Sequence, residues 1–211
     1  MRRRGLLGGV IGLGLSGCAA VNAVNRRPPE LYELTPKSTY PSDLARTDVE
    51  LTVEPPTATA GLNSARIALR PTPTRLEYYA DATWIDVVPE MIHTLLIESF
   101  DNSGAIDVLP KDVIGVRADY ALIPHIREFQ AEYAAIDQPP TVRVRLQSRL
   151  LRLPKRTSLA STSKFAEIKA QATDLPTIVS AFDEAFGRVA KDLVIWTVEE
   201  VVAAEGDGRA I

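Results

Sequence analysis

The sequence predicts one α+β domain in which two helices pack on one face of a mixed, largely antiparallel sheet. Runs with the two-residue period of strands and runs with the 3.6-residue period of helices follow in the order strands, helix, strands, helix. The later strand runs are long enough to form hairpins, and no segment repeats at the fixed period of a solenoid or propeller. The 211 residues suffice for one domain of ordinary size.

The first third of the folded chain is expected to supply short strands. Residues 31–34 form a short apolar run, and residues 49–54 alternate apolar with polar side chains up to a pair of prolines. Two further strands are predicted at residues 67–70 and 75–79. The connection between these two lacks the Asn-Gly or Gly-X signal of a tight hairpin, so we expect a looser loop there.

An amphipathic helix is predicted over residues 89–103. Apolar side chains recur there at spacings of three and four, Pro89 suits a first helical turn, and Gly104 suits the position that ends a helix. Its single apolar stripe suits packing on a sheet. Residues 120–133 return to strand character, and Pro124 within them indicates an edge position or a bulge.

The clearest strand covers residues 141–152, where apolar positions alternate with arginine-rich ones. Residues 159–165 are expected to form its antiparallel partner. A final helix begins with Asp174 as N-cap and carries apolar side chains at helical spacing. Residues 203–211 lack a core pattern and are expected to form a flexible tail, so that the folded domain covers residues 31–202.

The first residues have the pattern of a processed bacterial signal. Three arginines precede an apolar run at residues 5–15, and a Leu-Ser-Gly-Cys sequence then ends at Cys18. A run of roughly 11 residues is too short to cross a hydrocarbon core that needs about 20. We therefore expect residues 1–17 to be a signal peptide. Cys18 stands where bacterial lipoproteins carry their lipidated cysteine, and this resemblance predicts acylation of Cys18.

Composition limits the possible compartments and partners. Cys18 is the only cysteine, so the domain has no internal disulfide. The chain has 24 Lys and Arg against 27 Asp and Glu, and three of the arginines belong to the signal. The folded part is therefore acidic, and nucleic acid is not an expected partner. Residues 18–30 form a tether that reaches at most about 40 Å, which keeps the domain close to its membrane.

Two histidines are the only imidazoles available for acid–base chemistry. His93 lies in the first helix beside its apolar stripe, where a structural role is expected. His125 follows a proline in a strand. It is interpreted as a residue at the rim of the sheet or as a pH-sensitive contact, because no activated nucleophile can be named beside it. Trp84 and Trp196 are expected to pack in the core. No nucleophile elbow, zinc motif or phosphate-binding loop is present in the folded part, so we expect no catalytic residue, metal or cofactor.

Four arginines form the most concentrated basic surface that the sequence predicts. Arg143, Arg145 and Arg149 share one face of the clearest strand, and Arg127 lies on the strand before it. One interpretation is contact with anionic lipid headgroups or an acidic partner. The other is an ordinary solvated sheet face whose charge is offset by the many carboxylates, which is the commoner situation.

Several motifs follow one another in an order typical of one family. Within residues 65–109 an arginine-led strand begins at Arg66, a second strand contains Tyr78 and Tyr79, and Trp84 precedes a leucine-rich helix. In this order they resemble the ABC-type transport auxiliary lipoprotein family, the PqiC-like proteins that accompany MCE-type lipid transporters. Further matches are spread along the mature chain, at residues 32–36, 118–120, 156–165, 181–182 and near 196.

The resemblance implies a non-enzymatic accessory or docking component of an MCE-type ABC transporter that moves phospholipids between membranes. The MCE-domain protein, the permease and the ATPase would be separate partner chains. Ala19 after the acylated cysteine favours the periplasmic face of the outer membrane by the usual bacterial sorting pattern. Direct phospholipid binding and homo-oligomerisation stay open. The alternative function is a regulatory lipoprotein that binds an envelope enzyme such as a peptidoglycan synthase.

Overall fold

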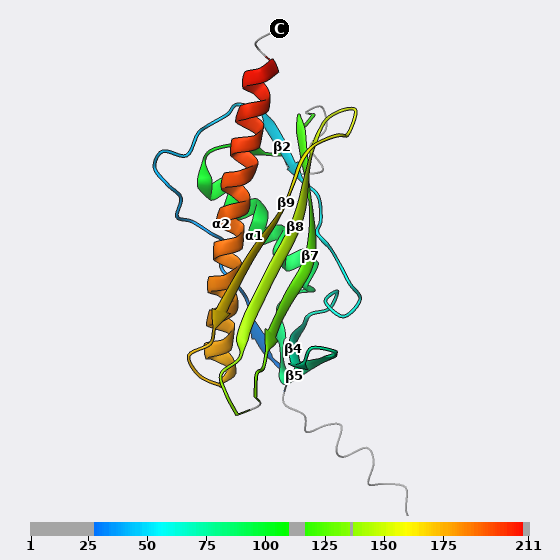
Figure 1. Cartoon of the computed structure of the whole chain (residues 1–211), viewed down its shortest axis with the longest axis vertical. Coiled ribbons are helices and arrows are strands. Elements are labelled where there is room, and N and C mark those ends of the chain that lie inside the picture. Colours follow the sequence, from blue (N-terminus) through cyan, green and yellow to red (C-terminus); the bar gives the residue numbers. More distant parts are fainter. Residues whose placement is uncertain (1–27, 110–116, 136, 209–211) are drawn as a thin grey trace, which may run out of the picture.

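The computed structural model describes residues 28–109, 117–135 and 137–208 (Figure 1). Within these ranges the chain forms nine strands and two helices. In chain order they are β1 (Glu30–Tyr32), β2 (Glu50–Val53), β3 (Thr57–Ala58), β4 (Arg66–Thr72), β5 (Arg75–Trp84), α1 (Val88–Ser103), β6 (Asp107–Val108), β7 (Tyr120–Glu132), β8 (Thr141–Arg152), β9 (Thr157–Lys169) and α2 (Leu175–Gly208).

Strand β7 is the centre of the sheet. One of its edges pairs antiparallel with β8, which in turn pairs antiparallel with β9. The other edge is shared by three short strands, β2, β3 and β4, each parallel to β7. Strand β5 pairs antiparallel with β4, and β1 and β6 add parallel to β5 and β2. The sheet is therefore mixed, and its long pairings are antiparallel, which confirms the predicted fold class.

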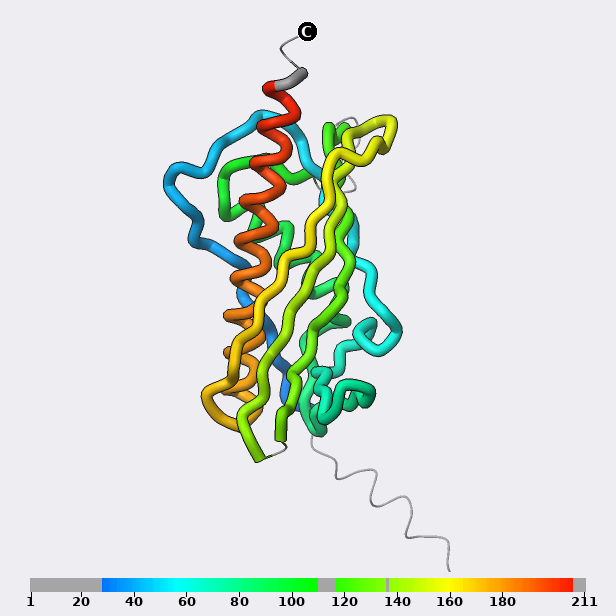
Figure 2. Tube along the Cα trace, viewed as in Figure 1, coloured from blue at the N-terminus to red at the C-terminus, as the bar shows by residue number. Residues whose placement is uncertain are grey.

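Both helices lie on the same face of this sheet and leave the other face of β7–β9 without a helix (Figure 1). Helix α2 runs along most of the length of the molecule, and the segment between β1 and β2 passes beside it (Figure 2). That segment is fixed to both helices, because the Thr35 amide donates to Asp183 Oδ1 of α2 at 2.6 Å and the Lys37 amide donates to Ser99 Oγ of α1 at 2.9 Å. No helix in the described ranges is long and apolar enough to span a bilayer.

The ends of both helices follow the sequence signals. Pro89 stands in the first turn of α1, and Gly104 ends that helix in the left-handed region with a φ of 57°, where a side chain would be strained. Asp174 precedes α2, and its Oδ1 accepts a hydrogen bond from the Thr177 amide at 3.0 Å. This bond, and then a second one from the Thr177 hydroxyl, lower the pKa of the Asp174 carboxyl below its ordinary value. Both predicted helix starts are confirmed.

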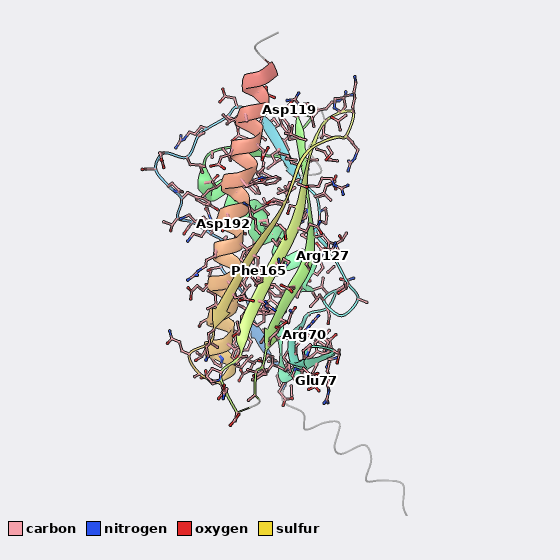
Figure 3. The ribbon with its side chains drawn as sticks, viewed as in Figure 1. Arg70, Glu77, Asp119, Arg127, Phe165 and Asp192 are labelled. Carbon is pink, nitrogen blue, oxygen red and sulfur yellow. The ribbon has the colours of Figure 1, made fainter. Side chains whose placement is uncertain are left out.

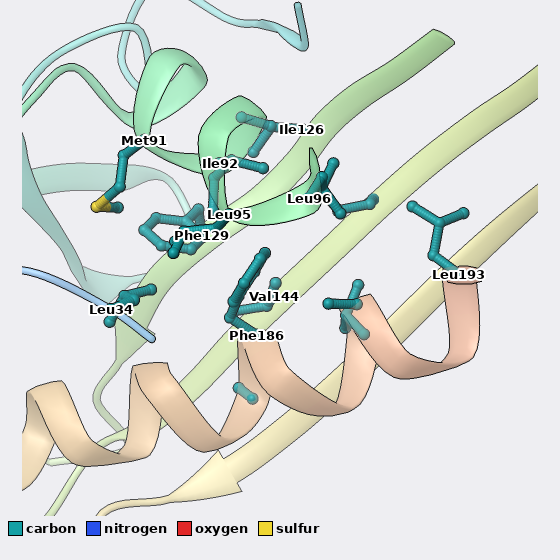
Figure 4. Close-up of a cluster of buried hydrophobic side chains, with 14 of the residues drawn as sticks. Leu34, Met91, Ile92, Leu95, Leu96, Ile126, Phe129, Val144, Phe186 and Leu193 are labelled. Atoms are coloured by element: carbon teal, nitrogen blue, oxygen red, sulfur yellow. The ribbon is translucent and has the colours of Figure 1, made fainter. Parts of the chain in front are cut away.

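The core lies between the two helices and the inner face of the sheet (Figure 4). Three aromatic rings form its centre: Trp84 of β5 and Phe129 of β7 lie 5.7 Å apart between centroids, and Phe182 of α2 lies 5.3 Å from Trp84 and 5.2 Å from Phe129. Trp196 is partly buried and packs against the hydrophobic core. Both tryptophans therefore have the structural role expected of them.

The connection between β4 and β5 differs from the expected loose loop. Thr72 pairs directly with Arg75, so that only Pro73 and Thr74 connect the strands. The guanidinium of Arg70 also donates to the Pro73 carbonyl oxygen at 3.4 Å. Proline restricts the backbone of the turn, and this favours a tight connection although the glycine of the common hairpin turns is missing.

Pro124 lies in a central strand, so the edge position considered for it is wrong. The Leu122 carbonyl accepts a hydrogen bond from the Glu54 amide, so the backbone polar groups of Leu122 point toward β2 and β3. Pro124 is two residues further along β7, and its backbone points in the same direction. The proline falls opposite the gap between these two short strands, where no amide donor is needed. The strand does contain a bulge, but the register shift lies between Ile126 and Glu128.

Helix α2 continues to Gly208, past residue 202 where the domain was expected to end. Two contacts from the sheet hold this last part of the helix. The Tyr120 hydroxyl donates to Glu205 Oε1 at 2.6 Å, and the Arg152 guanidinium donates to the Ala204 carbonyl oxygen at 3.1 Å. An arginine at the last carbonyls of a helix is stabilising, so these tertiary contacts replace the missing apolar pattern over residues 203–208.

Candidate functional site

The outer face of β7, β8 and β9 carries the four arginines identified from the sequence. Alternation along β8 turns its valines and leucines toward the helices and Arg143, Arg145 and Arg149 toward solvent. Arg127 points outward from β7 at mid-height of the same face, with Phe165 of β9 further across it (Figure 3). The structure therefore places all four arginines on one surface, as the sequence predicts, but gives them different neighbours.

Arg143 and Arg145 are neutralised by carboxylates on the adjacent strands. Arg143 forms ion pairs with Glu132 of β7, at 3.1 Å, and with Glu167 of β9. Arg145 Nε lies 3.0 Å from Glu128 Oε2, and its guanidinium stacks 3.9 Å from the ring centre of Phe165. For these two residues the interpretation as an ordinary solvated face fits the structure, since carboxylates on the adjacent strands compensate their charges.

The β7 bulge places Arg127 on the outer face. His125 pairs with Gln147 and Glu128 pairs with Arg145, so that Arg127 is an extra residue on β7 within this stretch. A bulge redirects a side chain in this way without breaking the strand. Arg127 Nε donates to Gln147 Oε1 at 2.8 Å, which fixes the guanidinium above β8.

A recess of about 390 Å³ lies on this face beside Arg127. Its walls include Arg127 and His125 of β7, Gln147 and Arg149 of β8, and Ser161 of β9. Ser161 and Arg149 are directly paired across β8 and β9. Within the described part of the chain no carboxylate pairs with Arg127 or Arg149, and none lines the recess. The recess is therefore a local basic site on an acidic domain.

His125 is held in this recess by a neighbour on β3. Its Nδ1 lies 2.7 Å from Thr57 Oγ1. Burial, and then the charge of Arg127, lower the pKa of His125 below its ordinary value. The ring is therefore neutral near pH 7, and the recess carries its positive charge on the two guanidiniums.

The remaining candidate residues lie elsewhere. His93 Nε2 lies 2.9 Å from the Val53 carbonyl oxygen, a contact that connects α1 to β2 and agrees with a structural role. Cys18 lies outside the described residues. Among residues 28–109, 117–135 and 137–208 no group of three or more His, Cys, Asp or Glu side chains is placed to hold a metal ion.

Sequence reasoning found the arginines but not the recess. Ser161 enters it only through the register of β9 on β8, and Arg127 through a bulge that has no sequence signal of its own. The pair of prolines before β3 and the histidine of β7 gave no indication that Thr57 and His125 would meet. The alternation along β8 was the sequence signal that pointed to this part of the site, because it correctly placed Gln147 between two arginines on the outer face.

The described residues form a small α+β domain with a local basic recess on its helix-free sheet face. The family model of the ABC-type transport auxiliary lipoprotein component matches residues 32–194, and the chain belongs to this family. The membership confirms the resemblance drawn from the sequence motifs.

Individual proteins are similar to this chain in sequence or in fold. An uncharacterized protein of Bradyrhizobium diazoefficiens is 31% identical over 169 residues, which cover 79% of this chain and 44% of that protein. The chain thus spans less than half of that relative. The crystal structure of protein XCC0632 from Xanthomonas campestris matches with a TM-score of 0.78 and 27% identity, over 83% of this chain and 98% of the other. The hypothetical protein CT253 from Chlamydia trachomatis shares the fold, with a TM-score of 0.54 and 9% identity over 74% of this chain and 99% of its own.

Proposed function

We propose that this protein is a non-enzymatic lipoprotein of the outer membrane that docks or assists an MCE-type ABC transporter moving phospholipids between membranes. It is attached at the periplasmic face by acyl chains on Cys18. Its partners are the MCE-domain protein, the permease and the ATPase of that system.

The observation that carries this proposal is the family match over residues 32–194, which covers nearly the whole folded domain. The family supplies the transport assignment, and the sequence motifs supply the likeness to MCE-associated members. The signal pattern ending at Cys18 adds the anchor. Together the family match and the signal pattern support a protein that is anchored to a membrane and works with other chains.

The shape of the domain suits such a role. Strand β1, where the tether enters, lies at one end of the long axis, and the C-terminal end of α2 lies at the other (Figure 1). A tether of at most about 40 Å keeps the β1 end within that distance of the membrane. The far end and the helix-free face of the sheet then stay accessible to a partner.

A hydrolytic function has less support. The Thr57–His125 contact is the one hydroxyl–imidazole pair recorded among the described residues. A general base of this kind needs a group that stabilises the imidazolium it becomes, usually a carboxylate. Here the charged neighbour is Arg127, which lowers the pKa of His125 and opposes that protonation.

Crosslinking in cells tests the proposal. A full chain with a C-terminal tag is treated with a short crosslinker, isolated, and its attached proteins are identified by mass spectrometry. The proposal expects an MCE-domain protein, and expects Cys18→Ser to reduce its recovery because the variant is not anchored. Recovery of a peptidoglycan synthase without any MCE-domain protein would contradict the proposal and favour the regulatory alternative.

A further inference from the structure

We propose that the recess on the helix-free face binds the phosphate of an anionic phospholipid headgroup, and that Arg127 and Arg149 are its two principal ligands. This inference deepens the proposed function and rests on it for the source of the phosphate. It assigns the recess to the headgroup alone.

The two arginines have donors left over for a ligand. A guanidinium has five N–H donors in a planar fork that matches the oxygens of a phosphate. Arg127 uses its Nε on Gln147, and its terminal amino groups stay available. Arg149 has no carboxylate partner among the described residues, in contrast to Arg143 and Arg145 on the same face. Of the four arginines on this face, Arg127 and Arg149 are therefore the two without a carboxylate partner among the described residues, and both line the recess.

The spacing of the two arginines suits one phosphate between them. Gln147 and Arg149 are two residues apart on β8, so their backbones are separated by about 6.5 Å and their side chains leave the same face. Arg127 is held beside Gln147 by its hydrogen bond. Both arginines line the recess, and Gln147, which lines it as well, is the neighbour of each.

Neutral donors complete the site. Ser161 supplies a hydroxyl from β9. When the Thr57 hydroxyl donates to Nδ1 of His125, the second ring nitrogen carries the proton and becomes a donor as well. No carboxylate lines the recess to repel an anion. The combination of two cations and two neutral donors is that of an anion site.

The lining also sets the part of the lipid that fits. A volume of about 390 Å³ accommodates a headgroup. Ile123 is the one sizeable apolar side chain among its walls, so acyl chains gain little there and stay in the bilayer or in a partner protein. The site therefore holds a headgroup presented to it and is unsuited to carrying a whole lipid.

The test measures binding to the acylated full chain in a neutral detergent by calorimetry. The probes are dihexanoyl phosphatidylglycerol, dihexanoyl phosphatidylcholine and inorganic phosphate. We expect phosphatidylglycerol to bind more tightly than the other two, and Arg127→Gln with Arg149→Gln to weaken it by at least about tenfold, because charge-assisted hydrogen bonds are lost. The matched control is Arg188→Gln, which removes an exposed arginine of α2 and should change the affinity less than twofold.

Each other outcome overturns the inference. Equal weakening by Arg188→Gln means a general charge effect, and inorganic phosphate binding as tightly as phosphatidylglycerol means a phosphate site that does not recognise lipid. If the double variant binds phosphatidylglycerol normally but no longer crosslinks to an MCE-domain protein, the recess is a protein contact. If both properties persist, this inference fails while the proposed function stands.

Discussion

Replacing Phe182 by alanine tests whether the aromatic cluster between α2 and the sheet stabilises the fold. Its ring is fully buried and lies within 5.3 Å, between centroids, of both Trp84 and Phe129. Truncation removes both ring contacts and leaves a cavity, so we expect a loss of about 4 kcal/mol in the free energy of unfolding. For a chain of this length that corresponds to a fall in melting temperature of about 8 to 16 °C.

Thermal unfolding followed by tryptophan fluorescence measures this loss, since Trp84 is itself in the cluster. Phe165→Ala is the matched control: the same truncation on the outer sheet face removes a half-buried ring and its stacking with Arg145. We expect a loss of about 1 kcal/mol for the control, because its ring is partly solvated and an exposed cation–π contact is weak. Equal losses for the two variants would show that the packing of α2 on the sheet contributes less than we infer.

Three further outcomes are expected. Cys18→Ser should abolish palmitate labelling and membrane attachment in fractionated cells while circular dichroism stays unchanged; persistent labelling would refute the anchor. Because the folded-state pKa of His125 is lowered, the unfolded chain takes up the proton first as pH falls below about 6.5, so the melting temperature should drop there, and less so in His125→Asn. Arg152→Ala should speed hydrogen exchange in the last turns of α2 near Glu205, and unchanged exchange would argue against that contact.

Local sequence signals predicted the elements whose pattern is long and regular. The alternation along β8, the caps of α1 and the N-cap at Asp174 were each readable because the residues that form the feature are close in sequence. The antiparallel partner of β8 was also predicted, since it follows the strand directly. Its observed bounds, Thr157–Lys169, extend the predicted segment at both ends.

Features that depend on contacts between residues far apart in the chain could not be predicted from the sequence. The two residues of β3 form a strand only because β7 offers them a free edge. The last turns of α2 are fixed by Tyr120 and Arg152, from strands more than 50 residues earlier in the chain. The recess required both the β7 bulge and the β8–β9 register, so the sequence identified its arginines without distinguishing the paired from the unpaired ones.

The transport function is tested most directly by the rate at which labelled phospholipid moves between the two membranes in cells. The rate is compared between cells with the wild-type chain, cells that lack it, and cells with Cys18→Ser. We expect both altered strains to move phospholipid more slowly, with the wild-type rate restored by the unaltered chain. Unchanged phospholipid movement in both strains, together with altered activity of a peptidoglycan synthase, would contradict the transport function.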